Sequence, residues 1–273
     1  MRQLIVFTDL DGTLLNHHDY SWKEAIPAIE QLKYHGFPLI INSSKTFKEI
    51  EYLSSKINTY SPVISENGAV VSLNIDFDTY LESNINIYNH HYSGKSYEEI
   101  LNIIHKIRTE VNLNFTGFND MSISEIMKVT GLDYSSAKKA GERNATEPII
   151  WSDSQINLDT FIEKLNANDL TITKGGRFYH VMSPVNKGQA MLWLLECYKK
   201  KYPEIEWFSM ALGDGINDAQ MLDNADYPVL VKNDQASQPD VSHNKDIIVS
   251  EFSGAKGWNV SVQDRIDKFV RGN

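Results

Sequence analysis

Three short apolar runs lie in the first quarter of the chain, at Leu4–Phe7, Pro38–Ile41 and Val63–Ile64. None of them alternates with polar residues, which is typical of strands covered on both faces, as in a parallel sheet. The apolar spacing of Ile26–Leu32 predicts a helix between the first two runs. A capping-box pattern predicts a second helix over Thr46–Ile57. This order of strands and helices predicts right-handed βαβ units.

The middle of the chain follows a different pattern. Capping boxes at Ser96/Glu99 and Ser122/Glu125 predict two helices, and a third is expected around Leu158–Leu165. Strands are expected at Leu113–Phe118 and Ile149–Trp151, and a hairpin at Leu170–Thr173 and Phe178–Met182 around Gly175-Gly176. This mixture predicts an α+β unit with antiparallel strands.

The βαβ rhythm returns with a predicted helix over Asn186–Tyr198 and a buried strand at Trp207–Leu212. Two short strands, Val229–Val231 and Ile247–Val249, and an amphipathic helix ending near Val270 complete the pattern. The predicted fold class is therefore α/β, a Rossmann-like core with a parallel sheet, interrupted by an inserted α+β unit. We expect the core to be residues 1–83 and 186–273 and the insertion to be residues 84–185, and 273 residues suffice for two such units.

Charge and composition exclude several classes of function. With 26 Lys and Arg against 36 Asp and Glu, the net charge is −10, which argues against a nucleic-acid or anionic-membrane partner. An anionic substrate would need cations supplied locally by the site. The single cysteine, Cys197, excludes a disulfide framework and a cysteine-based zinc site. Without a signal peptide or an apolar membrane span, we expect a cytoplasmic protein; the sequence leaves its oligomeric state open.

Two strand ends carry strong candidate chemistry. Asp9 and Asp11 follow the first strand in Asp-Leu-Asp-Gly-Thr, a pattern with a chance probability of about 10⁻⁵ per position. Such carboxylates could hold a hard cation together, or one could attack while the other transfers protons. The strand at Trp207–Leu212 ends in Gly-Asp-Gly-Ile-Asn-Asp, in which Asp214 and Asp218 share a face if a helix begins there.

Two further segments gain weight only from their neighbours. Ser43, Ser44 and Lys45 stand at the end of the second strand and before a helix, where they form either an anion cradle or an ordinary helix cap. Lys187 opens the helix after the insertion and is either the local cation or a solvated lysine.

The order Asp-x-Asp, Ser, Lys and Gly-Asp-Gly-x-x-Asp resembles the haloacid dehalogenase superfamily of phosphatases across the whole chain. The insertion falls where the family's larger cap lies. Five segments are similar to the branch that acts on glycosyl-3-phosphoglycerates: Asp9–Leu15, Asn42–Thr46, Ser65–Ala69, Gly176–Val181 and Gly213–Leu222. The resemblance therefore implies a small phosphorylated sugar or glycerate as the substrate.

The resemblance also implies catalytic roles. Asp9 would be the nucleophile that forms an aspartyl-phosphate, and Asp11 would protonate the leaving alcohol and then deprotonate water. Mg²⁺ would be held by Asp9, the backbone carbonyl of Asp11 and Asp214, with Asp218 in support. Phosphoryl oxygens would be bound by Ser43 and Lys187, and the phosphate or substrate also by Ser44, Lys45 and Asn217.

Substrate choice is expected to come from the insertion and nearby loops. Arg177 could read the carboxylate of a phosphoglycerate through a bidentate guanidinium. Lys45, Glu66, Asn67 and His180 could read the sugar or glycerate, and for each a plain surface or turn role stays open.

Other functions compete with this one. They are hydrolysis of other sugar phosphates, phosphotransfer to a sugar as in phosphomannomutases, and glycosyl transfer through a metal bound by Asp-x-Asp. The Gly213–Asp218 motif and Lys187 argue against glycosyl transfer. A non-catalytic sugar-phosphate sensor would be expected to lack Asp9 or Asp11, and both are present.

Overall fold

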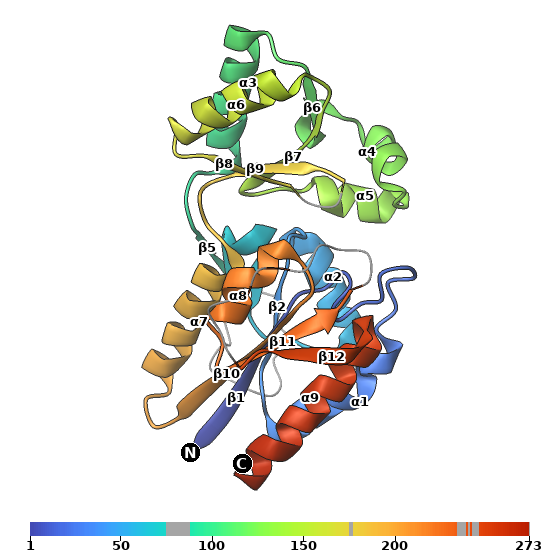
Figure 1. Cartoon of the computed structure of the whole chain (residues 1–273), viewed down its shortest axis with the longest axis vertical. Coiled ribbons are helices and arrows are strands. Elements are labelled where there is room, and N and C mark those ends of the chain that lie inside the picture. The colour runs from blue at the N-terminus through green and yellow to red at the C-terminus, as the bar shows by residue number, and fades with distance from the viewer. Residues whose placement is uncertain (75–87, 175–176, 234–238, 240, 242–245, 273) are drawn as a thin grey trace.

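The computed structural model describes residues 1–74, 88–174, 177–233, 239, 241 and 246–272. Its strands form two separate sheets, a large one of eight strands and a small one of four (Figure 1). The mixed α/β fold class predicted from the sequence is confirmed by this arrangement. Among the described residues, no helix is both long and apolar enough to cross a membrane.

The large sheet has the strand order β12-β11-β10-β1-β2-β3-β4-β5. Neighbouring strands from β12 to β3 are parallel, while β4 is antiparallel to both β3 and β5. The strands are β1 (Arg2–Thr8), β2 (Leu39–Asn42), β3 (Val63–Ser65), β4 (Val70–Asn74), β5 (Tyr88–Tyr92), β10 (Glu206–Gly213), β11 (Tyr227–Lys232) and β12 (Ile248–Ser253).

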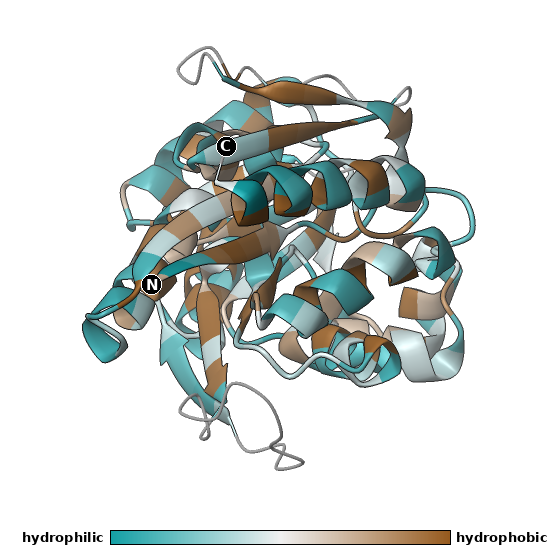
Figure 2. Ribbon diagram, turned by 90° about the horizontal axis from the view of Figure 1, so that it is seen from below, coloured by the Kyte–Doolittle hydropathy of each residue, from teal (hydrophilic) through white to brown (hydrophobic). Residues whose placement is uncertain are grey.

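Helices cover both faces of the large sheet. Because side chains alternate along a strand, Leu4 and Val6 of β1 pack with the helices on one face, and Ile5 and Phe7 pack with those on the other. Figure 2 shows the apolar residues concentrated along the strands and hydrophilic bands on the outer turns of the helices. The first face carries α1 (Ile26–His35), α2 (Phe47–Ile57) and α9 (Gly254–Arg271), and the second carries α7 (Lys187–Lys201) and α8 (Ala219–Asp223).

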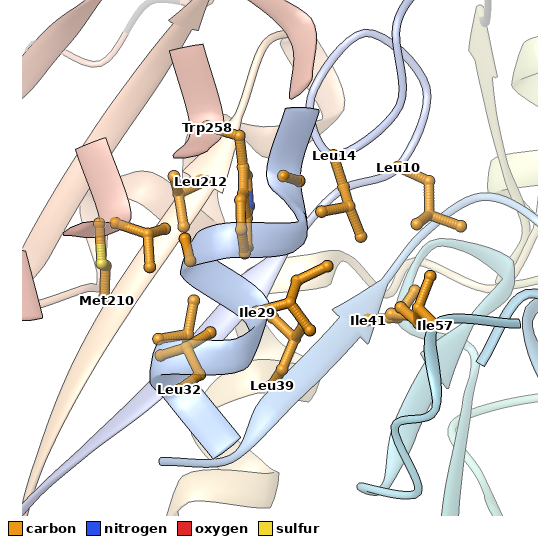
Figure 3. Close-up of a cluster of buried hydrophobic side chains, with 14 of the residues drawn as sticks. Leu10, Leu14, Ile29, Leu32, Leu39, Ile41, Ile57, Met210, Leu212 and Trp258 are labelled. Atoms are coloured by element: carbon orange, nitrogen blue, oxygen red, sulfur yellow. The ribbon is translucent and has the colours of Figure 1, made fainter. Parts of the chain in front are cut away.

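Trp258 of α9 is the largest fully buried side chain of the first face, where it lies near Leu14 and Leu212 (Figure 3). Its indole Nε1 donates to the hydroxyl of Thr8 at 2.9 Å, and that hydroxyl donates to the carbonyl of Asp9 at 2.7 Å. A buried indole N–H needs such a partner. The last helix thereby fixes the end of β1, where the predicted nucleophile lies.

The small sheet is antiparallel, with the order β6-β7-β9-β8. One face is covered by α3 and α6, through apolar side chains such as Ile104, Ile149 and Phe161. The elements are β6 (Phe115–Gly117), β7 (Thr146–Trp151), β8 (Thr171–Lys174), β9 (Tyr179–Met182), α3 (Tyr97–Val111), α4 (Ile123–Thr130), α5 (Tyr134–Gly141) and α6 (Gln155–Asn166).

Local sequence signals are confirmed at several positions. Thr46, Ser96 and Ser122 each head a helix with a reciprocal capping box. The predicted pairing of β8 with β9 is present, while its turn at Gly175-Gly176 lies outside the described residues. Short 3₁₀ turns occur at Lys23–Ala25, Glu66–Gly68, Phe118–Asp120 and Ile216–Asp218.

Strands β4 and β5 and helix α5 were not expected from the sequence. β5 falls inside the range 84–185 proposed for the insertion, yet it pairs with β4 in the large sheet. Its sequence, Tyr-Asn-His-His-Tyr, is largely exposed and lacks the apolar run by which the other strands were found. The division of the chain at residues 84 and 185 stays a prediction.

Candidate active site

Asp9 and Asp214 lie at the carboxyl ends of two adjacent parallel strands, β1 and β10. The backbone N–H of Asp9 donates to the carbonyl of Leu212 at 2.9 Å, which continues the ladder into the loop. The chain order reverses at this strand pair, the place where open α/β sheets bind ligands. Gly12 is required here, since its φ is +85° and a Cβ would lie 2.5 Å from a carboxylate oxygen of Asp214.

Asp214 is also fixed by hydrogen bonds to its side chain. The hydroxyl of Thr13 donates to its Oδ1 at 2.7 Å, and the amide of Asn233 donates to its Oδ2. Asp218 folds back over the same loop, where its Oδ2 accepts the backbone N–H groups of Asp214 and Gly215 at 3.1 and 2.9 Å. The two aspartates therefore meet across a turn before the helix, and not along one helical face.

Lys187 is the cation of this site. It is the first residue of α7, and its Nζ lies 2.6 Å from Asp9 Oδ1 and 2.7 Å from Asp218 Oδ1. Its side chain is 0% exposed. The alternative of a solvated lysine is therefore wrong.

Burial governs the electrostatics of the cluster. It raises the pKa of Asp9 to about 6, because the lowering by Lys187 is outweighed by desolvation and by the charge of Asp218. Burial and the charge of Asp9 also raise the pKa of Asp214. For Lys187, burial lowers the pKa, but Asp218 and Asp9 raise it more strongly. Three carboxylates thus share one ammonium, which leaves the cluster short of positive charge.

The same residues fit a hard cation. Carboxylate oxygens of Asp9, Asp214 and Asp218 lie within 4.8 Å of one another, all three residues are buried, and every donor is oxygen. Asp218 already uses one oxygen for Lys187 and the other for backbone N–H groups. The oxygens of Asp214, by contrast, accept only from the uncharged side chains of Thr13 and Asn233, and Lys187 holds only one oxygen of Asp9. Asp9 and Asp214 are therefore the stronger candidates for direct ligands, and Asp218 is suited to holding the loop and the lysine.

Asp11 pairs with Lys45 at the mouth of the cluster. Lys45 Nζ lies 2.8 Å from Asp11 Oδ2, while Asp11 Oδ1 is buried without a hydrogen-bond partner. Burial lowers the pKa of Lys45, but the charges of Asp11 and Glu49 raise it more strongly. One carboxylate oxygen of Asp11 therefore pairs with a lysine in the loop after β2, and the other oxygen is not used by this ion pair.

The loop after β2 is tied to the end of β3. The backbone N–H of Ser43 donates to the carbonyl of Ile64 at 3.0 Å, and the carbonyl of Ser43 accepts from the N–H of Asn67 at 3.0 Å. The amide of Asn217 donates to Asn67 Oδ1 at 3.1 Å. Ser43 and Asn217 are therefore brought to one side of the site through Asn67.

Glu66 connects the large sheet to the small one. Its carboxylate accepts the backbone N–H groups of Asn144 and Ala145 at 2.8 and 3.1 Å and the hydroxyl of Thr146 at 2.7 Å. Glu66 is fully buried, with a φ of +53° that a non-glycine residue rarely adopts. This geometry indicates a structural role for Glu66, whose carboxylate ties the loop before β7 to the large sheet.

The cap residues lie apart from the carboxylate cluster. Arg177 is exposed, and its Nη1 donates to the carbonyl of Thr130 at the end of α4, at 2.6 Å. His180 is partly buried, and its Nδ1 has no partner. Arg143, which no sequence pattern singled out, donates to the carbonyl of Ser44 at 3.1 Å and so joins the cap to the loop after β2.

A model of the haloacid dehalogenase-like hydrolase family matches residues 6–244. This span holds both carboxylate motifs, the loop after β2 and Lys187. The chain belongs to this family, as the order of its motifs predicted.

Two curated relatives are similar over almost the whole chain. A glucosyl-3-phosphoglycerate/mannosyl-3-phosphoglycerate phosphatase of Persephonella marina is 38% identical over 98% of this chain and 99% of its own length. A phosphatase of the same description from Methanococcoides burtonii is 36% identical over 97% of each chain. The predicted enzyme class, a phosphatase of the haloacid dehalogenase superfamily, is confirmed by these relatives.

Solved structures share the fold. A crystal structure of a Thermotoga maritima protein superposes with a TM-score of 0.66 at 22% identity, over 97% of each chain. A haloacid dehalogenase-like hydrolase from B. subtilis gives a TM-score of 0.64 at 19% identity, over 96% of this chain and 98% of its own. At such identities the likeness shows the fold alone.

Proposed function

We propose that this protein is a Mg²⁺-dependent phosphatase of 2-O-mannosyl-3-phosphoglycerate, or of a close glycosyl-3-phosphoglycerate. Its products would be the glycosylglycerate, such as mannosylglycerate, and inorganic phosphate. The observation that carries the reaction is the buried cluster in which Lys187 joins Asp9 to Asp218 beside Asp214. The substrate class is supported by the names of the two relatives that match over nearly their full length.

Asp9 is the proposed nucleophile. One of its oxygens is held by Lys187, and its other oxygen attacks phosphorus while the bond from phosphorus to the ester oxygen breaks. Asp11 gives its proton to the departing alcohol. Asp11 then removes a proton from water, which attacks the aspartyl-phosphate and releases phosphate.

Charge balance explains the need for cations. A carboxylate that attacks a phosphate dianion meets repulsion between like charges. Mg²⁺ held by Asp9, the backbone carbonyl of Asp11 and Asp214, with Asp218 in support, would supply the missing positive charge when bound. Lys187, which pairs with Asp9, would reduce the repulsion between the Asp9 carboxylate and the substrate's phosphate.

Phosphoryl oxygens are proposed to bind at the strand ends that flank Asp9. Ser43 and Ser44 offer hydroxyl donors, and Lys45 and Lys187 offer charge. Asn217 would contact the substrate from the opposite loop. A role for Arg177 in reading the carboxylate stays a prediction, as do the cytoplasmic location and the absence of nucleic-acid and membrane partners.

A phosphate-release screen tests the function. The substrates are mannosyl-3-phosphoglycerate, glucosyl-3-phosphoglycerate, mannose 6-phosphate and glucose 6-phosphate, with Mg²⁺ present and Asp9→Asn as the inactive control. We expect kcat/KM to be at least about tenfold higher for the two phosphoglycerates, and Asp9→Asn to lose about 10²–10⁴-fold or more. A preference for simple sugar phosphates would instead indicate a phosphatase of other sugar phosphates. Transfer of phosphate to a sugar would indicate a phosphotransferase.

A further inference from the structure

Arg143 carries a partly buried guanidinium that makes no ion pair with any residue the structure describes. Its Nε donates to the carbonyl of Ala140 at 3.0 Å, and its Nη1 donates to the carbonyl of Ser44 at 3.1 Å and to the hydroxyl of Thr146 at 3.2 Å. All three acceptors are uncharged. Within the described part of the chain, no carboxylate oxygen lies within 4.0 Å of its nitrogens and Nη2 donates to no acceptor, while the guanidinium carbon lies 6.0 Å from the centre of the Phe118 ring.

The nearest acids are engaged elsewhere. The carboxylate of Glu66 accepts hydrogen bonds from the N–H groups of Asn144 and Ala145 and from the hydroxyl of Thr146. The Thr146 hydroxyl thus lies between Glu66 and Arg143. Glu147 accepts a hydrogen bond from the hydroxyl of Tyr97 at 2.6 Å and from a backbone N–H at 2.9 Å. Among the described residues, the guanidinium of Arg143 therefore keeps two N–H donors without an ion-pair partner at the junction of the two sheets, while its face lies over the Phe118 ring.

This charge lies beside the predicted phosphate loop. Ser44, which receives one hydrogen bond from Arg143, sits between Ser43 and Lys45. Thr146 is the first residue of β7 in the small sheet. Arg143 is therefore hydrogen-bonded to the small sheet through Thr146 and to the loop after β2 through Ser44. A ligand bound through its phosphate at this loop would have the guanidinium next to it.

His180 joins Arg143 on the same side of the small sheet. His180 of β9 is paired with Pro148 of β7, which is two residues from Thr146, so all three side chains share one face. Met182 of the same face packs against Ala69 of the core, which shows that this face is turned toward the large sheet. Burial, with a smaller effect of the Arg143 charge, lowers the pKa of His180 to about 3 and keeps it neutral at physiological pH, and its buried Nδ1 has no hydrogen-bond partner among the described residues.

We propose that Arg143, assisted by His180, forms a cap-side subsite for a second anionic group of the substrate, the carboxylate of a phosphoglycerate. The planar fork of a guanidinium suits a carboxylate, and a substrate with phosphate and carboxylate a few atoms apart would bridge the loop after β2 and Arg143. This assignment deepens the proposed function and rests on it. It differs from the expectation for Arg177, which is exposed and bonded to Thr130.

Two probes isolate the carboxylate. 3-Phosphoglycerate and glycerol 3-phosphate differ only in a carboxylate against a hydroxymethyl group, and each is measured as a competitor of p-nitrophenyl phosphate hydrolysis. The wild type should bind 3-phosphoglycerate about 10–100-fold more tightly. Arg143→Ala should abolish that difference and leave the inhibition constant of glycerol 3-phosphate within a fewfold.

Parallel variants separate recognition from folding. Lys138→Ala removes an exposed cation from α5, the helix that ends just before Arg143, and should keep the difference. Arg143→Lys keeps a charge but loses the fork, so it should retain only part of the difference, and His180→Ala should reduce it without affecting glycerol 3-phosphate. Melting temperatures identify any variant that fails to fold, and in that case Arg143→Lys and His180→Ala decide.

Three outcomes would overturn the subsite. The first is equal binding of the two probes by the wild type, the second is equal losses on both probes in Arg143→Ala, and the third is loss of the difference in Arg177→Ala but not in Arg143→Ala. The screen over glycosyl-phosphoglycerates fails or succeeds independently of these competition constants, so the two proposals can be told apart.

Discussion

Replacing Lys187 by methionine tests the charge balance of the active site. The substitution keeps most of the side-chain volume but removes an ammonium that is 0% exposed and lies 2.6 and 2.7 Å from two aspartates. Breaking a buried ion pair by removing one partner costs about 3–5 kcal/mol, because the remaining charge stays buried. We therefore expect the free energy of unfolding to fall by about this amount at pH 8 in the presence of a chelator.

The loss should depend on pH in a defined direction. Without the ammonium, which lowers it, the pKa of Asp9 in the folded protein should rise further above its unfolded value. A carboxyl group with a raised pKa binds its proton more tightly when folded, so its contribution to stability falls as the pH rises above about 4. Lys187→Met should thus be less destabilised at pH 5 than at pH 8.

Urea unfolding at the two pH values measures this effect. Met191→Ala on the same helix is the matched control, because it removes a fully buried apolar side chain and should cost about 2–5 kcal/mol at either pH. Lys187→Met should also lose about 10²–10³-fold in kcat with Mg²⁺ present. Equal destabilisation at pH 5 and pH 8 would refute the electrostatic account and reduce Lys187 to a packing residue.

Three other predictions concern the metal, the turn that ends at Gly68, and Glu147 in the small sheet. Chelation should abolish phosphatase activity and added Mg²⁺ should restore it, with Asp214→Ala requiring far more metal; full activity in metal-free buffer would contradict the oxygen site. Gly68→Ala should lower the melting temperature more than Gly36→Ala, because both glycines have positive φ but only a Cβ at position 68 would collide with the carbonyl oxygen of Asn186. Burial raises the pKa of Glu147 from 4.5 to about 7, so the folded protein holds a proton that the unfolded chain releases, and stability should fall between pH 5 and pH 8 by up to about 3 kcal/mol. Glu147→Gln should flatten that slope in thermal melts, and an unchanged slope would assign it to other groups.

The apolar runs and the capping boxes were enough to predict most of the core. A strand such as Leu4–Phe7 is visible because it is buried on both faces, and Thr46 is visible because its cap is local in sequence. β5 escaped prediction because its residues are polar and exposed and its pairing comes from tertiary structure. α5 is short and combines alanine, lysine and glycine, so it offers no apolar stripe of useful length.

The candidate site could be predicted where its functional residues come directly after a strand in the sequence. Asp9 and Asp214 could be paired in advance because parallel strands end at one edge. Trp258 and Arg143 could not, since each is placed at the site by a hydrogen bond to a residue far away in sequence, Thr8 in the first case and Ser44 in the second. An apolar pattern places a tryptophan in the core but does not say which hydroxyl its N–H will find.

The pairing of β1 with β10 has a consequence for biosynthesis. Thr13 and its partner Asp214 are 201 residues apart, and at roughly 5–20 residues per second a ribosome needs about 10–40 s to make the intervening chain. During that time the apolar first strand has no neighbour on one side, while the small sheet, with strands only from Phe115 to Met182, can already be complete. The strand that carries the proposed nucleophile is thus translated first and gains its last neighbour late, so its open edge stays available for pairing with other chains during synthesis.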